Sequence, residues 1–232
     1  MPEPDRRSET IVRNYAVLCG LTPLVPLPFV DDLVKGYFRR RMVRGLAAAR
    51  AAPLAPADVQ ALADEPRGGC LTGCLGAAFV YPLKRIFRKI FFFLEWKRAV
   101  DTASETYHFG SLVDYALQER WMPPVGEIAA SRVRAGVDAV LQRRGTGPIE
   151  IAVRESFSRS KAGVASAARG LRRALGGLGA RPADDQVERA LQESALARDG
   201  APLADDLGRA LDDVPPSYMA GLCWQLADEV KR

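Results

Sequence analysis

Residues 15–42 read YAVLCGLTPLVPLPFVDDLVKGYFRRRM, and this stretch changes from an apolar to a basic composition. The first sixteen residues of this stretch carry no charge and include three prolines, and the sequence then changes abruptly to Arg39, Arg40 and Arg41. Proline lacks a backbone N–H donor and disfavours helix at the residue before it, so the prolines interrupt a helix that ends at Leu21. An apolar helix, a proline-rich turn and a basic helix are therefore expected in succession.

The rest of the chain predicts an all-α fold. Ala, Leu and Arg are frequent, β-branched residues do not cluster, and apolar residues recur at helical spacing. We predict a helical bundle with two short apolar, Pro/Gly-interrupted, hairpin-like segments and an acidic helical C-terminal tail. The helices are expected over Glu9–Leu21, after a cap at Asp31 or Asp32, over Phe79–Arg98, around Ile128–Leu141, as one helix over Ile149–Leu175 with a cap at Thr146, and as two or three short acidic helices after it.

Charge divides the chain into a basic body and an acidic tail. The net charge is +5, but residues 181–232 contain 6 basic and 11 acidic side chains, which leaves residues 1–180 at about +10. A basic body attracts polyanions, and the acidic tail either leaves that body open or packs against it and masks it. The pattern predicts three regions: a hydrophobic and basic helical region that associates with membranes (1–122), an amphipathic helical pair (123–180) and an acidic helical region (181–232).

Two uncharged runs, residues 14–30 and 68–83, raise the question of a membrane. The first is 17 residues long, which as helix would reach about 25 Å against a hydrocarbon core of roughly 30 Å. Basic residues flank both runs, which fits a segment that enters the membrane surface and returns, or helices docked among the headgroups. The alternative is a buried hairpin in a helical core, without any membrane.

Two basic amphipathic helices are the candidate surfaces for lipid or another polyanion. The first follows Asp32, and no acid occurs again before Asp58. The second, RIFRKIFFFLEWKR, has three consecutive phenylalanines, which cover more of a helix than one buried stripe needs. Aromatic rings settle among headgroups while basic side chains reach the phosphates. The predicted lipid- or polyanion-binding residues are Lys35, Arg39, Arg40, Arg41, Arg44, Lys84, Arg85, Arg88, Lys89, Phe92 and Phe93.

The segment GLTPLVPLPFVDDLVKGYFRRRMVRGLA resembles part of a known bacterial family. It is similar to the short hydrophobic segment G-L-I-P-I-P-x-V-D, followed by a Met-containing helix, of the YcjF-type domain of unknown function. The resemblance covers residues 11–46 and implies a bacterial protein associated with the inner membrane. That domain also follows some GTPase domains, but G-x-x-x-x-G-K-[ST] is absent here, so nucleotide hydrolysis is not implied. The residues that carry the resemblance are Gly20, Pro26, Pro28, Asp31 and Met42. Departures from the pattern are the extra Pro23, the doubled Asp31–Asp32 and the arginine triplet.

No motif in the chain predicts catalysis, a cofactor or a metal. His108 is the single histidine, and although a nearby carboxylate would orient it as a general base, a histidine without a chemical role is favoured. The four cysteines fit no metal-ligand spacing, and the paired acids suit helix starts. We therefore predict a protein that is not an enzyme, with no catalytic residues, no metal and no cofactor.

These observations together predict a membrane-associated helical scaffold or adaptor. Its partners would be an anionic membrane surface and a protein partner or second copy, at the cytoplasmic face of the inner membrane, either peripheral or re-entrant. One alternative is a soluble cytoplasmic nucleic-acid-binding protein, because Arg-rich helices with interleaved aromatics contact phosphates and bases. That alternative leaves the two uncharged runs without a purpose. A third alternative is an effector that perturbs membranes.

Overall fold

The computed structural model describes residues 6–25, 30–64, 88–178, 183–192 and 196–232, with side chains outside the description at 30–32, 88–93, 192 and 196–199. All regular structure in these residues is helical, which confirms the predicted all-α class. The elements are α1 (Arg6–Leu21), the 3₁₀ turn η1 (Thr22–Leu24), α2 (Val30–Ala49), α3 (Pro56–Ala63), α5 (Arg88–Gln118), α6 (Ala130–Arg143), α7 (Pro148–Arg159), α8 (Lys161–Leu175), α9 (Asp184–Gln192), α10 (Leu196–Leu211) and α11 (Pro216–Lys231).

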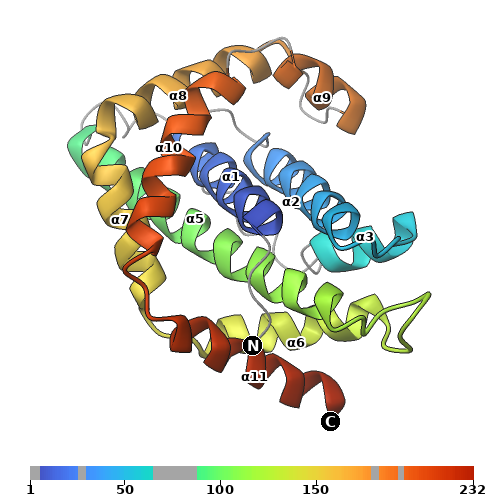
Figure 1. Ribbon diagram of the computed structural model, residues 1–232. Helices are drawn as coiled ribbons and strands as arrows, with labels where there is room; N and C mark the ends of the chain where they lie inside the picture. The colour runs from blue at the N-terminus through green and yellow to red at the C-terminus, as the bar shows by residue number, and fades with distance from the viewer. Residues whose placement is uncertain (1–5, 26–29, 65–87, 179–182, 193–195) are drawn as a thin grey trace.

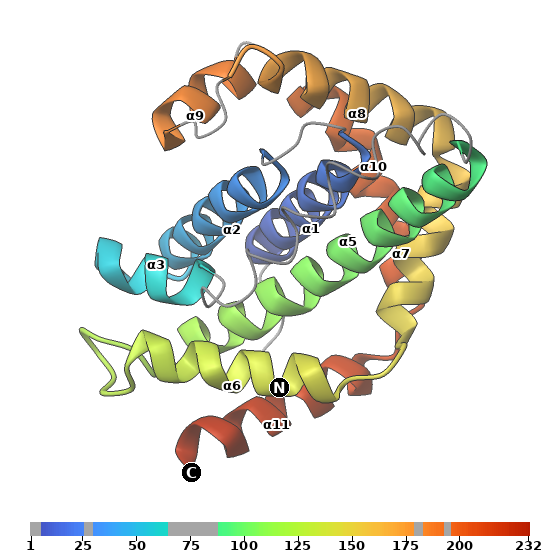
Figure 2. The ribbon, with the colours of Figure 1, turned by 180° about the vertical axis from the view of Figure 1, so that it is seen from behind.

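The long helix α5 is the element around which the others are arranged. In Figures 1 and 2, α1 and α2 lie along one side of α5, with α3 beside the end of α2, and α6 and α11 cross near its C-terminal end. Helices α7, α8 and α10 form an arch around its N-terminal half. Helix α9 continues beyond the end of α8 and lies near α2, with which it is in contact.

Two hydrophobic clusters form the core, and α5 contributes to both. The first joins the N-terminal half of α5 to α1, the first half of α2, α7, α8, α9 and α10. The second joins the C-terminal half of α5 to the second half of α2, α3, α6 and α11. Each cluster contains residues from all three regions that composition distinguishes, 1–122, 123–180 and 181–232. The three regions therefore share their hydrophobic packing.

A close approach between α1 and α5 explains a glycine in the first apolar run. A Cβ added at Gly20 would lie 2.7 Å from the Cβ of Ala103 and 3.1 Å from the ring of Phe157. Only a residue without a side chain fits at this distance. The described part of the first run is thus packed inside the protein, with Val17 and Leu21 buried, as the core-hairpin alternative expects. The second run, 68–83, lies outside the described residues.

Several helix boundaries differ from those predicted. Helix α2 begins at Val30, before Asp31 and Asp32, so neither aspartate is its N-cap. Thr146 is not a cap either, because α7 begins with Pro148 directly after Gly147.

The predicted helix from Ile149 to Leu175 is two helices, separated at Ser160. The Ser160 hydroxyl donates to the carboxylate of Asp206 in α10, and this contact accompanies the break. The helix predicted over Phe79–Arg98 is described only from Arg88 and continues to Gln118.

Candidate anion-binding surface

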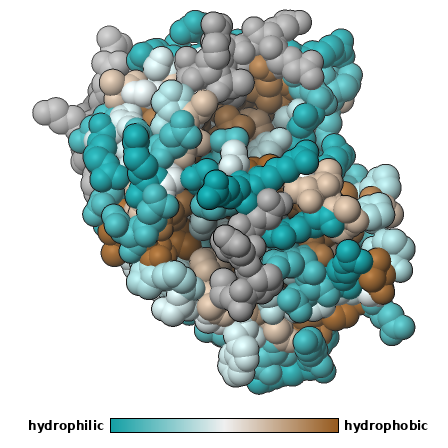
Figure 3. Space-filling view, in the orientation of Figure 1, coloured by the Kyte–Doolittle hydropathy of each residue, from teal (hydrophilic) through white to brown (hydrophobic). Residues whose placement is uncertain are grey.

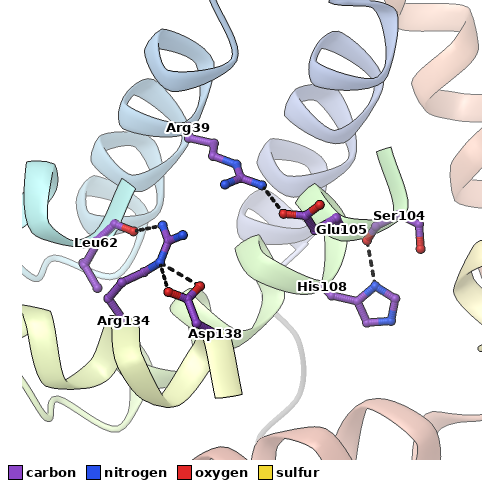
Figure 4. Close-up of polar contacts among 7 residues, drawn as sticks. All are labelled: Arg39, Leu62, Ser104, Glu105, His108, Arg134 and Asp138. Atoms are coloured by element: carbon purple, nitrogen blue, oxygen red, sulfur yellow. Dashed lines mark hydrogen bonds and ion pairs between the residues drawn. The ribbon is translucent and has the colours of Figure 1, made fainter. Parts of the chain in front are cut away.

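Arg39, predicted to bind lipid or another polyanion, is an interior residue. It is 1% exposed, and its guanidinium donates a 2.8 Å hydrogen bond to the Glu105 carboxylate of α5 (Figure 4). The same guanidinium lies 5.1 Å from the centre of the Phe109 ring, at a distance typical of a cation–π contact. The expectation that Arg39 faces a membrane is therefore wrong, because its charge is used between α2 and α5.

A second arginine approaches the same aromatic ring from α6. Arg134 lies 5.2 Å from the centre of Phe109, donates to the backbone carbonyl of Leu62 at 2.7 Å and pairs with Asp138 at 2.9 Å (Figure 4). The packing of α2, α3, α5 and α6 thus includes two arginines in place of purely apolar contacts. Because burying a charge is costly without a partner, both guanidiniums have a carboxylate in contact.

Arg40 and Arg41 are tied to the acidic C-terminal region. Arg40 donates to the two carboxylate oxygens of Asp184 at 2.6 and 3.1 Å and to Asp64 at 2.8 Å, while Arg41 donates to Glu188. Burial works against the charge of Arg40, but the hydrogen bonds to the two aspartates outweigh it, so its pKa is raised. The hydrogen bond that Arg41 donates to Glu188 likewise raises the pKa of Arg41.

The rest of the basic helix α2 divides between paired and exposed residues. Arg50, directly after the end of α2, donates two hydrogen bonds to the Asp114 carboxylate of α5, at 2.6 and 2.8 Å. Arg44 is exposed and Lys35 is half-buried. Although no acid occurs between Asp32 and Asp58 in the sequence, distant acids neutralise much of this helix in the fold. Of the predicted surface on α2, Arg44 is the residue most open to solvent.

The second predicted basic helix is largely outside the description. Lys84 and Arg85 lie among residues that are not described, and Arg88, Lys89, Phe92 and Phe93 lie in α5 where only the backbone is described. Their role in binding lipid stays a prediction.

The clearest exposed basic surface lies on α8, where sequence reasoning did not place one. We define the α8 basic face as Lys161, Arg169, Arg172 and Arg173, all exposed. The opposite side of α8 is buried and apolar, through Val164, Ala167, Ala168, Leu171 and Leu175.

The α8 basic face makes no ion pair within the part of the chain that the structure describes. No acid occurs in the sequence between Glu155 and Asp184. An absence of acids, between Asp32 and Asp58, likewise led to the prediction that α2 binds anions. Figure 3 shows the face of the molecule that includes α8 and α10, where hydrophilic residues cover most of the surface and hydrophobic ones appear in smaller patches.

The only histidine of the chain is fully buried and has structural partners. His108 Nδ1–H donates to the backbone carbonyl of Ser104 at 2.7 Å (Figure 4), and Nε2 accepts from the Tyr218 hydroxyl of α11 at 2.9 Å. Burial, with the nearby positive charge of Arg144, lowers the pKa of His108 to about 4. A neutral ring enclosed between α5 and α11 does not have the access to substrate that a general base needs.

A cavity of about 350 Å³ opens between the start of α8 and α10. It is lined by small residues, the apolar Leu203, and the opposite charges of Arg159 and Asp206. The Asp206 carboxylate already accepts from Ser160 and Arg209, which lowers its pKa. The positive and negative charges around the cavity therefore balance, and its lining favours neither a cation nor an anion.

Comparisons with protein-family models, with curated proteins and with solved structures found no match. The resemblance to the YcjF-type domain stays a prediction on the residues that carry it. None of the described helices is both long and apolar enough to cross a bilayer. The described residues also contain no group of three or more His, Cys, Asp or Glu side chains placed to hold a metal ion.

Proposed function

We propose that the protein is a peripheral helical adaptor that docks on an anionic membrane surface through the α8 basic face. The observation that supports this most is a helix whose buried side is apolar and whose outer side carries four basic residues without an ion-pair partner among the described residues. The four residues extend over about 18 Å of helix, at about 1.5 Å per residue. A flat anionic surface can contact such a row along its length.

The expected strength of this docking is modest. Each basic residue near an anionic leaflet contributes about 1 kcal/mol, and the attraction falls off within a Debye length. Binding should therefore weaken as salt is added. Compared with the sequence-based expectation, the proposal moves the main docking surface from α2 to α8, because Arg39, Arg40 and Arg41 are occupied by carboxylates.

The test compares two triple variants in co-sedimentation with vesicles that contain anionic lipid. Replacing Arg169, Arg172 and Arg173 with glutamine should weaken binding by about 100-fold, since three contacts of about 1 kcal/mol are removed. The control replaces the exposed Arg6, Arg132 and Arg143 with glutamine, which changes the net charge equally on α1 and α6. It should bind nearly as the wild type does.

Two results would overturn the proposal. One is equal loss in both triple variants, which would mean that net charge and not the α8 basic face determines binding. The other is a wild-type protein that ignores vesicles and binds RNA of random sequence through the same arginines. The residues between these arginines are Gly170 and Leu171, without an aromatic ring for base stacking, so we favour the membrane.

A further inference from the structure

Helix α9 attaches to the protein through two different sides. Its apolar residues Val187 and Leu191 pack against the first hydrophobic cluster, and Val187 is buried. Its carboxylates Asp184 and Glu188 reach across to Arg40 and Arg41 of α2. Since these residues are three or four positions apart, they share the inner half of the helix. An acidic helix therefore covers part of the basic helix that sequence analysis singled out.

The two ion pairs that hold α9 differ from the Arg39–Glu105 pair in how far the arginine is exposed. The side chain of Arg41 is 38% exposed and that of Arg40 is 18% exposed, whereas that of Arg39 is 2% exposed. Their carboxylate partners are similarly open to solvent, at 37% for Glu188, 43% for Asp184 and 39% for Glu105. An ion pair in which both groups are exposed contributes little to stability and is weakened by salt, because water and ions screen both charges. The Arg41–Glu188 contact is thus easier to exchange than the contact of the buried Arg39 with Glu105.

The position of α9 connects this contact to the α8 basic face. Figures 1 and 2 show α9 beyond the C-terminal end of α8, where Arg172 and Arg173 lie, and α9 contacts both α8 and α2. A membrane that approaches these arginines also comes near α9. It would repel the carboxylates of α9 and attract the arginines beneath them, so both effects favour separation of the two helices.

We propose that α9 is an internal competitor for a second anion-binding site, formed by Arg40 and Arg41. Lipid phosphates at an anionic surface take the place of Asp184 on Arg40 and of Glu188 on Arg41, and α9 moves away from α2. Arg40 keeps its contact with Asp64, whereas Glu188 is the carboxylate that pairs with Arg41 among the described residues, so the exchange replaces the ion pair of Arg41 as a whole. This inference rests on the proposed docking of the α8 basic face and adds its regulation.

The first experiment measures vesicle binding after the competing carboxylates are neutralised. The variant D184N/E188Q should bind anionic vesicles at least about fivefold more tightly, since a basic residue near the surface is released. The control D185N/D212N changes the net charge equally, with one replacement on the outer side of α9, where Asp185 pairs only with Arg189 among the described residues. Equal gains in both variants would overturn the proposal.

A combined variant identifies the origin of that gain. Adding R40Q and R41Q to D184N/E188Q should remove the gain, because the released arginines are no longer present. Retention of the full gain would contradict the proposal, since the gain would then come from lost repulsion alone. Circular dichroism and melting temperature establish that each variant is folded before binding is compared.

The second experiment observes α9 without any lipid, so that failure of the membrane proposal can be told apart from failure of this one. Hydrogen exchange of the amides in residues 184–192 should accelerate when NaCl is raised in the wild type, because screening weakens both ion pairs. In D184N/E188Q the exchange should already be fast and insensitive to salt. If wild-type α9 exchanges at the same rate at low and high salt, α9 is a fixed part of the fold, whatever the α8 variants show with vesicles.

Discussion

Helices α2 and α8 look alike in sequence, since both are basic, amphipathic and free of acids over a long interval, but the fold uses their charges differently. Three consecutive arginines of α2 contact carboxylates from α5, α9 and the end of α3. The basic residues of α8 face solvent without an ion pair among the described residues. A basic helix can therefore bind an anionic partner only where the fold places no carboxylates against its basic residues.

The partners of the α2 arginines are far away in the sequence. Glu105 is 66 residues from Arg39, and Asp184 and Glu188 are 144 and 147 residues from Arg40 and Arg41. Local charge counting cannot find such pairs. It can, however, show that an acidic region exists, and that a basic body and an acidic tail in one chain are candidates to neutralise each other.

The largest expected effect comes from breaking the interior pair of α2. Glu105→Gln removes the carboxylate that the buried Arg39 guanidinium contacts, and because the Glu105 side chain is itself 39% exposed, the free energy of unfolding should fall by about 2 kcal/mol. Denaturant unfolding measures the loss. The matched control Glu229→Gln removes a carboxylate whose partner Arg143 is 54% exposed, and should cost less than about 1 kcal/mol. Equal losses in the two variants would mean that Arg39 is effectively solvated in solution.

How far the sequence predicts this protein depends on the range of the interactions. The all-α class, the end of α1 near Leu21 and the helix around Val133–Val140 follow from local periodicity and from breakers such as proline, and these predictions are confirmed. The break at Ser160 was missed, because it coincides with a hydrogen bond to Asp206 of α10, which no local pattern reveals.

The type of candidate site could be predicted from the sequence, but the helix that carries it could not. An anion-binding amphipathic helix was expected, but the choice between α2 and α8 depends on which acids the tertiary fold brings near. The α8 basic face had its own signal, the absence of acids between Glu155 and Asp184. The aromatic residues of the second predicted surface, Phe92 and Phe93, carry a prediction that their described backbone does not test.

Among the interior groups, His108 should make the stability of the fold depend on pH, because it is neutral in the folded protein at pH values where it is charged in the unfolded chain. Because burial lowers the pKa of His108 from 6.5 to about 4, the unfolded chain binds a proton at pH values where the folded protein does not. Stability is therefore complete above about pH 6.5 and decreases as the pH falls toward about 4. Relative to His108→Gln, the wild type should lose about 2 kcal/mol of unfolding free energy between about pH 7 and pH 5.

The quantity to measure is the difference in unfolding free energy between the wild type and His108→Gln, since carboxylates also titrate near pH 4 and affect both proteins equally. Chemical unfolding curves at several pH values give that difference directly. If the wild type and His108→Gln lose stability in parallel as the pH falls, His108 is protonated as easily in the folded protein as in the unfolded chain. Its enclosure between Ser104 and Tyr218 would then open readily in solution.

The smallest expected effect concerns the exposed pair of α2, and it distinguishes the two kinds of arginine by their response to salt. Glu188→Gln removes the carboxylate from Arg41, but both side chains are more than a third exposed, so water replaces most of the lost interaction. The unfolding free energy should fall by less than about 1 kcal/mol. Salt screens the Arg41–Glu188 pair, in which both side chains are exposed, more than the Arg39–Glu105 pair, whose arginine is buried. The loss in Glu188→Gln should therefore shrink toward zero at high NaCl, while most of the loss in Glu105→Gln should persist. Unfolding curves for both variants at low and high salt make the comparison. A Glu188→Gln loss as large and as insensitive to salt as that of Glu105→Gln would show that α2 holds α9 as firmly as it holds α5, and Arg41 would then not be available to a partner.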